Sequence, residues 1–240
     1  MVREVASGVY LLEGMRASAV YALEVDGGVA LVDTCMPGSQ AQIMAQLEVV
    51  GYGIADLRAI ILTHAHFDHT GSAAALAAQS GAEVLAHRND APFIEGVSPL
   101  PYPAWPQRVT MGLAEGLLGD AIHCKVTRTL EDGEVLELLG GLEVLHVPGH
   151  TPGSICLYQP AQQVLFSGDL LVHSRRFSTR SDVRFSIPQF SVAPDAVPDA
   201  ARRLLDLPIE VLCCGHGEPI TTAAGERIRR LLNRSSSMAG

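Results

Sequence analysis

The chain has 240 residues, of which 48% are hydrophobic and 18% are charged, so it is long enough to bury a large core in one domain spanning residues 1–240. Its net charge of −9 disfavours a broad nucleic-acid surface, which needs clustered positive charge to displace counterions from phosphates. Lys125 is the only lysine, which argues against Schiff-base chemistry and a phosphate-loop lysine.

The N-terminus lacks the basic start and apolar stretch of a signal peptide, and no segment approaches the roughly 18 uninterrupted apolar residues of a membrane span. The cysteines include no Cys-x-x-Cys pair, which fits a reducing compartment. We therefore expect a cytoplasmic protein with a small-molecule substrate and no nucleic-acid or membrane partner. The sequence leaves a homodimer open.

Apolar runs in the first half predict strands at residues 19–25 and 29–32, followed by a helix over about 39–50. The run at 59–62 predicts a buried strand. An alanine-rich helix over 72–79 then ends before Gly81, since glycine commonly follows the last turn of a helix, and a strand resumes at 83–86.

The second half repeats this order. Strands are expected at 142–147, around Ile155, at 164–166 and at 210–213, with helices near 199–205 and 224–233. Two such series predict two β-sheets packed face to face, each covered outside by helices.

Residues 63–69 read Thr-His-Ala-His-Phe-Asp-His, directly after the predicted strand at 59–62. Imidazole and carboxylate together suit zinc or another first-row metal. His64 and His66 are expected to point the same way by strand alternation, while Asp68 and His69 lie beyond the turn and face a second ion. The motif therefore predicts two adjacent metal ions.

Three further donors occur downstream: His150, Asp169 and His216. Each follows a predicted strand, and each has a glycine beside it that permits a tight turn close to an ion. Donors that leave several strands at their ends are expected to meet at one edge of the sheets.

The order His-x-His-x-Asp-His, followed by His, Asp and His on later strand ends, resembles the metallo-β-lactamase superfamily of metallohydrolases. The resemblance covers the chain from residues 27–34 to the turn around His216. It implies an α/β fold of the αββα sandwich type, with two mixed sheets, helices on both outer faces and the metals at one sheet edge. It also implies two Zn²⁺ ions per chain, with Fe or Mn as alternatives. The implied ligands are His64, His66 and His150 for the first ion, Asp68, His69 and His216 for the second, and Asp169 bridging both.

Two cations would lower the pKa of a bridging water from 15.7 toward about 7, which makes hydroxide available at neutral pH. Asp68 is the expected catalytic residue, because it can orient this metal-bridging hydroxide and carry its proton. We therefore expect a dinuclear hydrolase of a small thioester, lactone or other ester. A mononuclear iron persulfide dioxygenase, a phosphodiesterase and a non-catalytic binding module are the alternatives.

At several positions the sequence differs from other members of the superfamily, and these differences narrow the range of expected substrates. Asp169 stands where true β-lactamases of some subclasses have cysteine or serine. Val172 occupies the place of a tyrosine common in acyl-homoserine lactonases, and the 24 residues after His216 are too few for the helical domain of glyoxalase II. Cys35 replaces the glycine of the usual Asp-Thr-Gly segment, and Asp33 is expected to hydrogen-bond a ligand rather than bind metal.

Residues 88–123 contain five prolines among large apolar side chains, which predicts an irregular lid over the metals. Tyr102 and Trp105 in this segment are expected to contact the substrate. A packing cluster or a dimer contact is the alternative. His173 and Arg176 are further expected substrate contacts, the arginine because its guanidinium can hold a carboxylate or phosphate.

Overall fold

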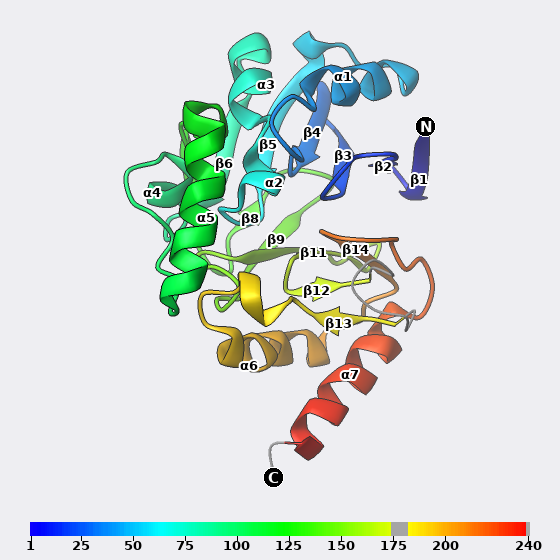
Figure 1. The fold of residues 1–240 in the computed structure, drawn as a ribbon. Coiled ribbons are helices and arrows are strands. Elements are labelled where there is room, and N and C mark those ends of the chain that lie inside the picture. The colour runs from blue at the N-terminus through cyan, green and yellow to red at the C-terminus, as the bar shows by residue number, and fades with distance from the viewer. Residues whose placement is uncertain (174–181, 239–240) are drawn as a thin grey trace.

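Two β-sheets form the centre of the molecule in the computed structural model, which describes residues 1–173 and 182–238 (Figure 1). The first sheet is mixed, because β1 to β4 pair antiparallel and β4 to β7 pair parallel. Its seven strands follow chain order: β1 (Val2–Ala6), β2 (Val9–Leu12), β3 (Val20–Val25), β4 (Gly28–Val32), β5 (Leu57–Leu62), β6 (Glu83–His87) and β7 (Arg128–Leu130).

The second sheet is also mixed, since β11 and β14 are parallel and its other pairs are antiparallel. Its order is β14 (Val211–Cys214), β11 (Val164–Gly168), β10 (Ile155–Gln159), β9 (Leu142–His146) and β8 (Val135–Leu136). A short antiparallel pair, β12 (Leu171–Val172) and β13 (Arg184–Phe185), follows β11 in the chain.

Helices connect the strands. They are α1 (Gln40–Val49), α2 (Phe67–Thr70), α3 (Ala73–Ser80), α4 (Ala91–Ile94), α5 (Trp105–Leu118), α6 (Val197–Ala201) and α7 (Ala224–Met238), with 3₁₀ turns at Ile54–Asp56, Gly119–Ile122, Pro188–Phe190, Pro194–Ala196 and Arg202–Asp206. Of these, α1, α3, α6 and α7 lie on the outer faces of the two sheets (Figure 1). As expected, α3 ends at Gly81, which has a φ of 75° and donates its N–H to the Ala77 carbonyl. No described helix has the length and apolarity needed to cross a bilayer.

Three apolar layers show how the sheets and helices pack. On β5, Ala59 and Ile61 face the layer between the sheets, while Ile60 and Leu62 face the layer under α1 and α3. This alternation follows from the two-residue period of a strand. A third layer joins the second sheet to α6 and α7 through residues such as Val197 and Ile228. The predicted αββα sandwich is confirmed.

The expectation of an irregular segment at 88–123 is wrong, because α4, α5 and a 3₁₀ turn occupy much of it. Pro92 and Pro106 lie in the first turns of α4 and α5, where backbone N–H groups have no acceptor within the helix. The side chain of Gln107 accepts the Ala104 N–H at 3.1 Å and caps the start of α5. The prolines therefore start helices here instead of preventing them.

Candidate metal centre

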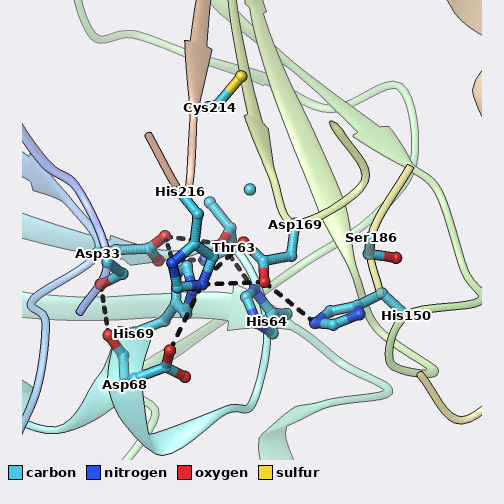
Figure 2. Close-up of polar contacts among 12 residues, drawn as sticks. Asp33, Thr63, His64, Asp68, His69, His150, Asp169, Ser186, Cys214 and His216 are labelled. Atoms are coloured by element: carbon cyan, nitrogen blue, oxygen red, sulfur yellow. Dashed lines mark hydrogen bonds and ion pairs between the residues drawn. The ribbon is translucent and has the colours of Figure 1, made fainter. Parts of the chain in front are cut away.

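All seven predicted donors meet at one edge of the two sheets (Figure 2). The turn after β5 carries His64 and His66, and the short helix α2 carries Asp68 and His69. The remaining three donors follow the ends of β9, β11 and β14, as the sequence predicted. Ligand atoms lie within 4.8 Å of one another in three overlapping groups: His64, His66 and His150; His64, His69 and Asp169; and Asp68, His69 and His216.

Short distances link the groups through Asp169. Its Oδ1 lies 3.4 Å from Nε2 of His69, and its Oδ2 lies 3.2 Å from Nε2 of His216 and 3.5 Å from Nε2 of His150. Oδ2 of Asp68 also lies 3.4 Å from Nε2 of His216. The carboxylate of Asp169 therefore stands between the first group of donors and the third, where a bridging ligand would be.

Each of the five histidines hydrogen-bonds through one ring nitrogen at the periphery of the site. The contacts are His64 Nδ1 to Thr63 Oγ1 (3.0 Å), His66 Nε2 to Tyr102 Oη (2.8 Å), His69 Nδ1 to Asp33 Oδ2 (2.7 Å), His150 Nδ1 to Ser191 Oγ (3.1 Å) and His216 Nδ1 to the Ala17 carbonyl (3.2 Å). Such contacts fix the ring orientation of metal-binding histidines and leave the other nitrogen for the ion.

The donor set fits transition-metal ions. Among the described residues, Nε2 of His64, Nε2 of His150 and Oδ1 of Asp169 are buried and have no hydrogen-bond partner. Buried polar atoms without partners are uncommon in folded proteins, and a cation among them would satisfy all three. Imidazole and carboxylate are also the ligand types that zinc, iron and manganese accept.

The pKa values of the donor histidines are shifted in two directions. Burial lowers the pKa of His66 to about 4 and holds the pKa values of His64 and His150 well below their usual range, so these rings are neutral and ready to ligate. Burial also acts to lower the pKa of His69, but the charges of Asp169 and Asp33 outweigh it and raise the value. A cluster of carboxylates thus favours positive charge around His69.

Asp33 supports the centre without being one of the grouped donors. Its carboxylate accepts the Thr63 N–H and hydroxyl, both at 2.8 Å, and contacts Nδ1 of His69 at 2.7 Å. The expected hydrogen bond between Asp33 and a predicted ligand, His69, is present. Cys35 has a φ of 58°, the left-handed conformation that glycine adopts most easily, which explains why glycine is usual at this position of the motif.

A buried carboxylate fixes the loop that carries His150. Asp90 accepts the Thr151 hydroxyl and the Gly153 N–H, both at 2.5 Å. A Cβ atom at Gly153 would lie only 2.7 Å from the Asp90 side chain, so this approach requires glycine. Nothing in the local sequence around Asp90 indicates this role, because Thr151 lies 61 residues away in the chain.

A cavity of about 320 Å³ opens above the donors. Its donor side includes His66, Asp68, His150, Asp169 and His216. Its other lining residues are mostly apolar: Ala17, Met36, Phe67, Met111, Val172, Ile187, Phe190 and Gly217. These residues come from segments far apart in the chain, so no local sequence pattern marks them as one cavity wall.

The four predicted substrate contacts have different surroundings. Tyr102 is 2% exposed and contacts His66 rather than the cavity, and Trp105 is 70% exposed and does not line the cavity. His173 also lies outside the lining, with its Nδ1 2.8 Å from the Glu218 carbonyl. Arg176 lies outside the described residues. From α5, Met111 lines the cavity instead.

The fold and the donor set define a protein of the metallohydrolase class. The sequence profile of the metallo-β-lactamase superfamily matches residues 14–216, so the chain belongs to this superfamily. Its fold is similar to that of a metallo-β-lactamase family protein from Thermus thermophilus, with a TM-score of 0.73 and 25% identity over 98% of this chain and 81% of that one.

Relatives with descriptive names point to hydrolysis. The chain is 29% identical to the probable metallo-hydrolase YflN of Bacillus subtilis (strain 168), over 98% of this chain and 94% of the relative. It is also 29% identical to the hydroxyacylglutathione hydrolase GloC of Haemophilus influenzae, over 86% and 88% of the two chains. The human acyl-coenzyme A thioesterase MBLAC2 is 29% identical over 75% of this chain, which spans 62% of that relative. Together the family and these names support a metal-dependent hydrolase.

The chain matches GloC over most of the length of both proteins. A protein named for hydroxyacylglutathione hydrolysis is matched over 88% of its own length. The expectation that the 24 residues after His216 are too few for such a substrate is therefore not supported by this relative.

Proposed function

We propose that the chain is a dinuclear metal-dependent hydrolase that cleaves a small thioester or related ester with an apolar acyl group. The observation that carries the proposal is the position of a mostly apolar cavity directly above seven converging donors. Such a cavity favours an apolar portion of a substrate, while the donors lie where a polar, scissile group would be.

The donor arrangement favours two ions over one. In the proposed centre, His64, His66 and His150 hold the first ion and Asp68, His69 and His216 hold the second, with Asp169 between them. Seven donors exceed what one tetrahedral ion uses. A mononuclear iron centre of the dioxygenase type would use only part of this donor set.

A bound transition metal would supply a coordinated water with a pKa of about 7 and would polarise the substrate oxygen. The chain supplies the remaining parts. Asp68 lines the cavity, and its carboxylate can accept a proton at an Oδ atom and release it to the departing thiolate or alkoxide. Phe67, Met111 and Phe190 hold the apolar group and exclude water from that side of the cavity.

The choice of a thioester is supported by two relatives. One is named an acyl-coenzyme A thioesterase and the other a hydroxyacylglutathione hydrolase. The cavity of about 320 Å³ lies at the small end of the usual range for ligand pockets, roughly 300–1,000 Å³, which fits a short acyl group better than a long chain. A lactone or an oxygen ester would use the same donors.

The proposal is tested by a substrate panel with protein of measured metal content. Zinc-loaded, manganese-loaded and iron-loaded samples are assayed on short acyl thioesters, lactones, oxygen esters and phosphodiesters. The proposal expects the highest kcat/KM for a short apolar thioester and loss of that activity on chelation. Activity confined to phosphodiesters, or oxygen consumption by the iron-loaded sample with no ester hydrolysis, would contradict it.

A further inference from the structure

Helix α5 has a continuous apolar stripe on the side away from the cavity. Its members recur every four residues and are strongly exposed: Trp105 (70%), Val109 (48%), Leu113 (64%) and Leu117 (88%). Residues four apart lie on the same side of a helix, so these four side chains form one surface, which we call the α5 stripe. No described side chain covers it.

The opposite side of α5 is fixed to the body of the protein. Met111 lines the cavity above the metal centre, and the side chain of Gln107 donates to the Gln189 carbonyl at 2.9 Å. Figure 1 shows α5 along the outer edge of the molecule. The helix therefore presents the α5 stripe to solvent from an anchored position, and exposed large apolar side chains gathered in this way mark interaction surfaces.

Two glycines give a second, independent indication. Gly112 and Gly116 lie within α5, where each costs about 0.5–1 kcal/mol of stability relative to alanine. A Cβ atom at either position would meet nothing within 4 Å, so the described part of the chain gives no reason for glycine there. On the helix surface Gly112 lies beside Val109 and Gly116 beside Leu113, since each glycine follows its neighbour by three residues. They open the space that the backbone of a second helix would need.

From the α5 stripe and its glycines, we infer that this face of α5 binds the same face of a second copy of the chain, with the two helices antiparallel. A two-fold axis near residue 111 then sets Trp105 against Leu117 of the partner subunit, and Val109 against Leu113 of the partner subunit. Arg108 and Glu115 lie outside this contact, because Arg108 donates to the Tyr102 carbonyl at 3.3 Å and Glu115 lines a second cavity on the body side of α5.

The extent of the surface fits a small dimer interface. A helix of 14 residues is about 21 Å long. A specific interface needs on the order of 500 Å² from each copy, and three aliphatic side chains with a tryptophan along such a helix provide an area of that order. Tryptophan is also among the residues that contribute most to the stability of interfaces.

A lipid surface is a poorer match than a second copy. Helices that lie on membranes carry several lysines or arginines on their polar side, whereas Arg108 is the one basic residue of α5. The net charge of −9 also repels anionic lipid.

Sedimentation velocity of the full, zinc-loaded chain over a wide range of concentration tests the inference. Wild type should show a two-copy species that grows with concentration. Leu113→Glu should weaken it by roughly tenfold or more, because the dimer would bury an unpaired carboxylate at its centre. The matched control is Val49→Glu, which makes the same change at an exposed position of α1 and should leave the dimer unchanged.

Thermal melts establish that each variant is folded, and Leu117→Glu replaces Leu113→Glu if the latter unfolds. A monomeric wild type at every concentration overturns the inference, as does a dimer that Leu113→Glu and Leu117→Glu leave intact. Binding of a monomeric chain to phosphatidylcholine vesicles, lost in these variants, would assign the stripe to lipid and overturn it as well.

Discussion

The phenol oxygen of Tyr102 lies 2.8 Å from Nε2 of His66, and both side chains are buried. If Nε2 of His66 donates this hydrogen bond, the lone pair of Nδ1 is left for a metal ion. The segment that was expected to cover the substrate thus supplies a contact that orients a proposed ligand.

We predict that Tyr102→Phe lowers metal affinity by roughly tenfold, since removing such a contact commonly weakens metal binding by about 10- to 100-fold. The free energy of unfolding of the metal-free protein should change by only about 1 kcal/mol, because the ring remains. Competition with a chelator gives the affinity, and nitrogen NMR gives the tautomer of His66. Unchanged affinity and tautomer would show that Tyr102 serves packing alone.

Asp68→Asn should lower kcat by roughly 100-fold or more at saturating metal, because the amide keeps the shape of the side chain but cannot carry a proton. Metal content must be measured on the same sample, so that an empty site is not mistaken for failed chemistry. His173→Ala is the comparison, and it should have a much smaller effect, since His173 does not line the cavity. Near-normal turnover by Asp68→Asn with both ions bound would remove Asp68 from the mechanism.

The apolar wall predicts a change in KM. Phe190 lines the cavity and is 46% exposed, so Phe190→Ala should leave the fold nearly intact while raising KM for an apolar thioester by roughly tenfold. Trp105→Ala should leave KM unchanged. The KM values of the two variants, from steady-state kinetics, show whether Phe190 in the cavity wall or Trp105 at the exposed end of α5 contacts the substrate. A larger KM effect from Trp105→Ala would restore the original expectation for that residue.

Asp90 predicts a pH dependence of stability. Burial raises the pKa of its carboxyl to about 6 from 3.8, against the hydrogen bonds from Thr151 and Gly153, which lower it. Between these two pH values the folded chain holds a proton that the unfolded chain has released. The contribution of Asp90 to the free energy of unfolding therefore falls as pH rises through this window, by about 3 kcal/mol at most.

Urea unfolding of wild type and Asp90→Asn at pH 4, 5 and 6 measures this contribution as a difference. The free energy of unfolding of wild type minus that of the variant should fall as pH rises, because the carboxyl of Asp90 titrates and the amide does not. Asp26→Asn, a change at an exposed turn, is the control and should give a constant difference. A constant difference for Asp90→Asn would contradict the shifted pKa.

The sandwich and the donor positions were predictable because their signals are local. Continuous apolar runs mark β5 and its neighbours, and each donor follows a strand within a few residues. Ser191 and Tyr102 carry no such signal, since they reach the histidines from 41 and 36 residues away. Helix α5 was not predicted for a different reason. A segment whose prolines begin helices has the same amino-acid composition as one whose prolines prevent them.

Metal stoichiometry tests the central claim most directly. Elemental analysis of the full chain, after incubation with excess zinc and removal of free metal, should give two ions per chain. Replacing His216 with alanine should leave about one, because the first three histidines are untouched. A single ion in wild type that persists under excess zinc, manganese and iron would contradict the dinuclear centre.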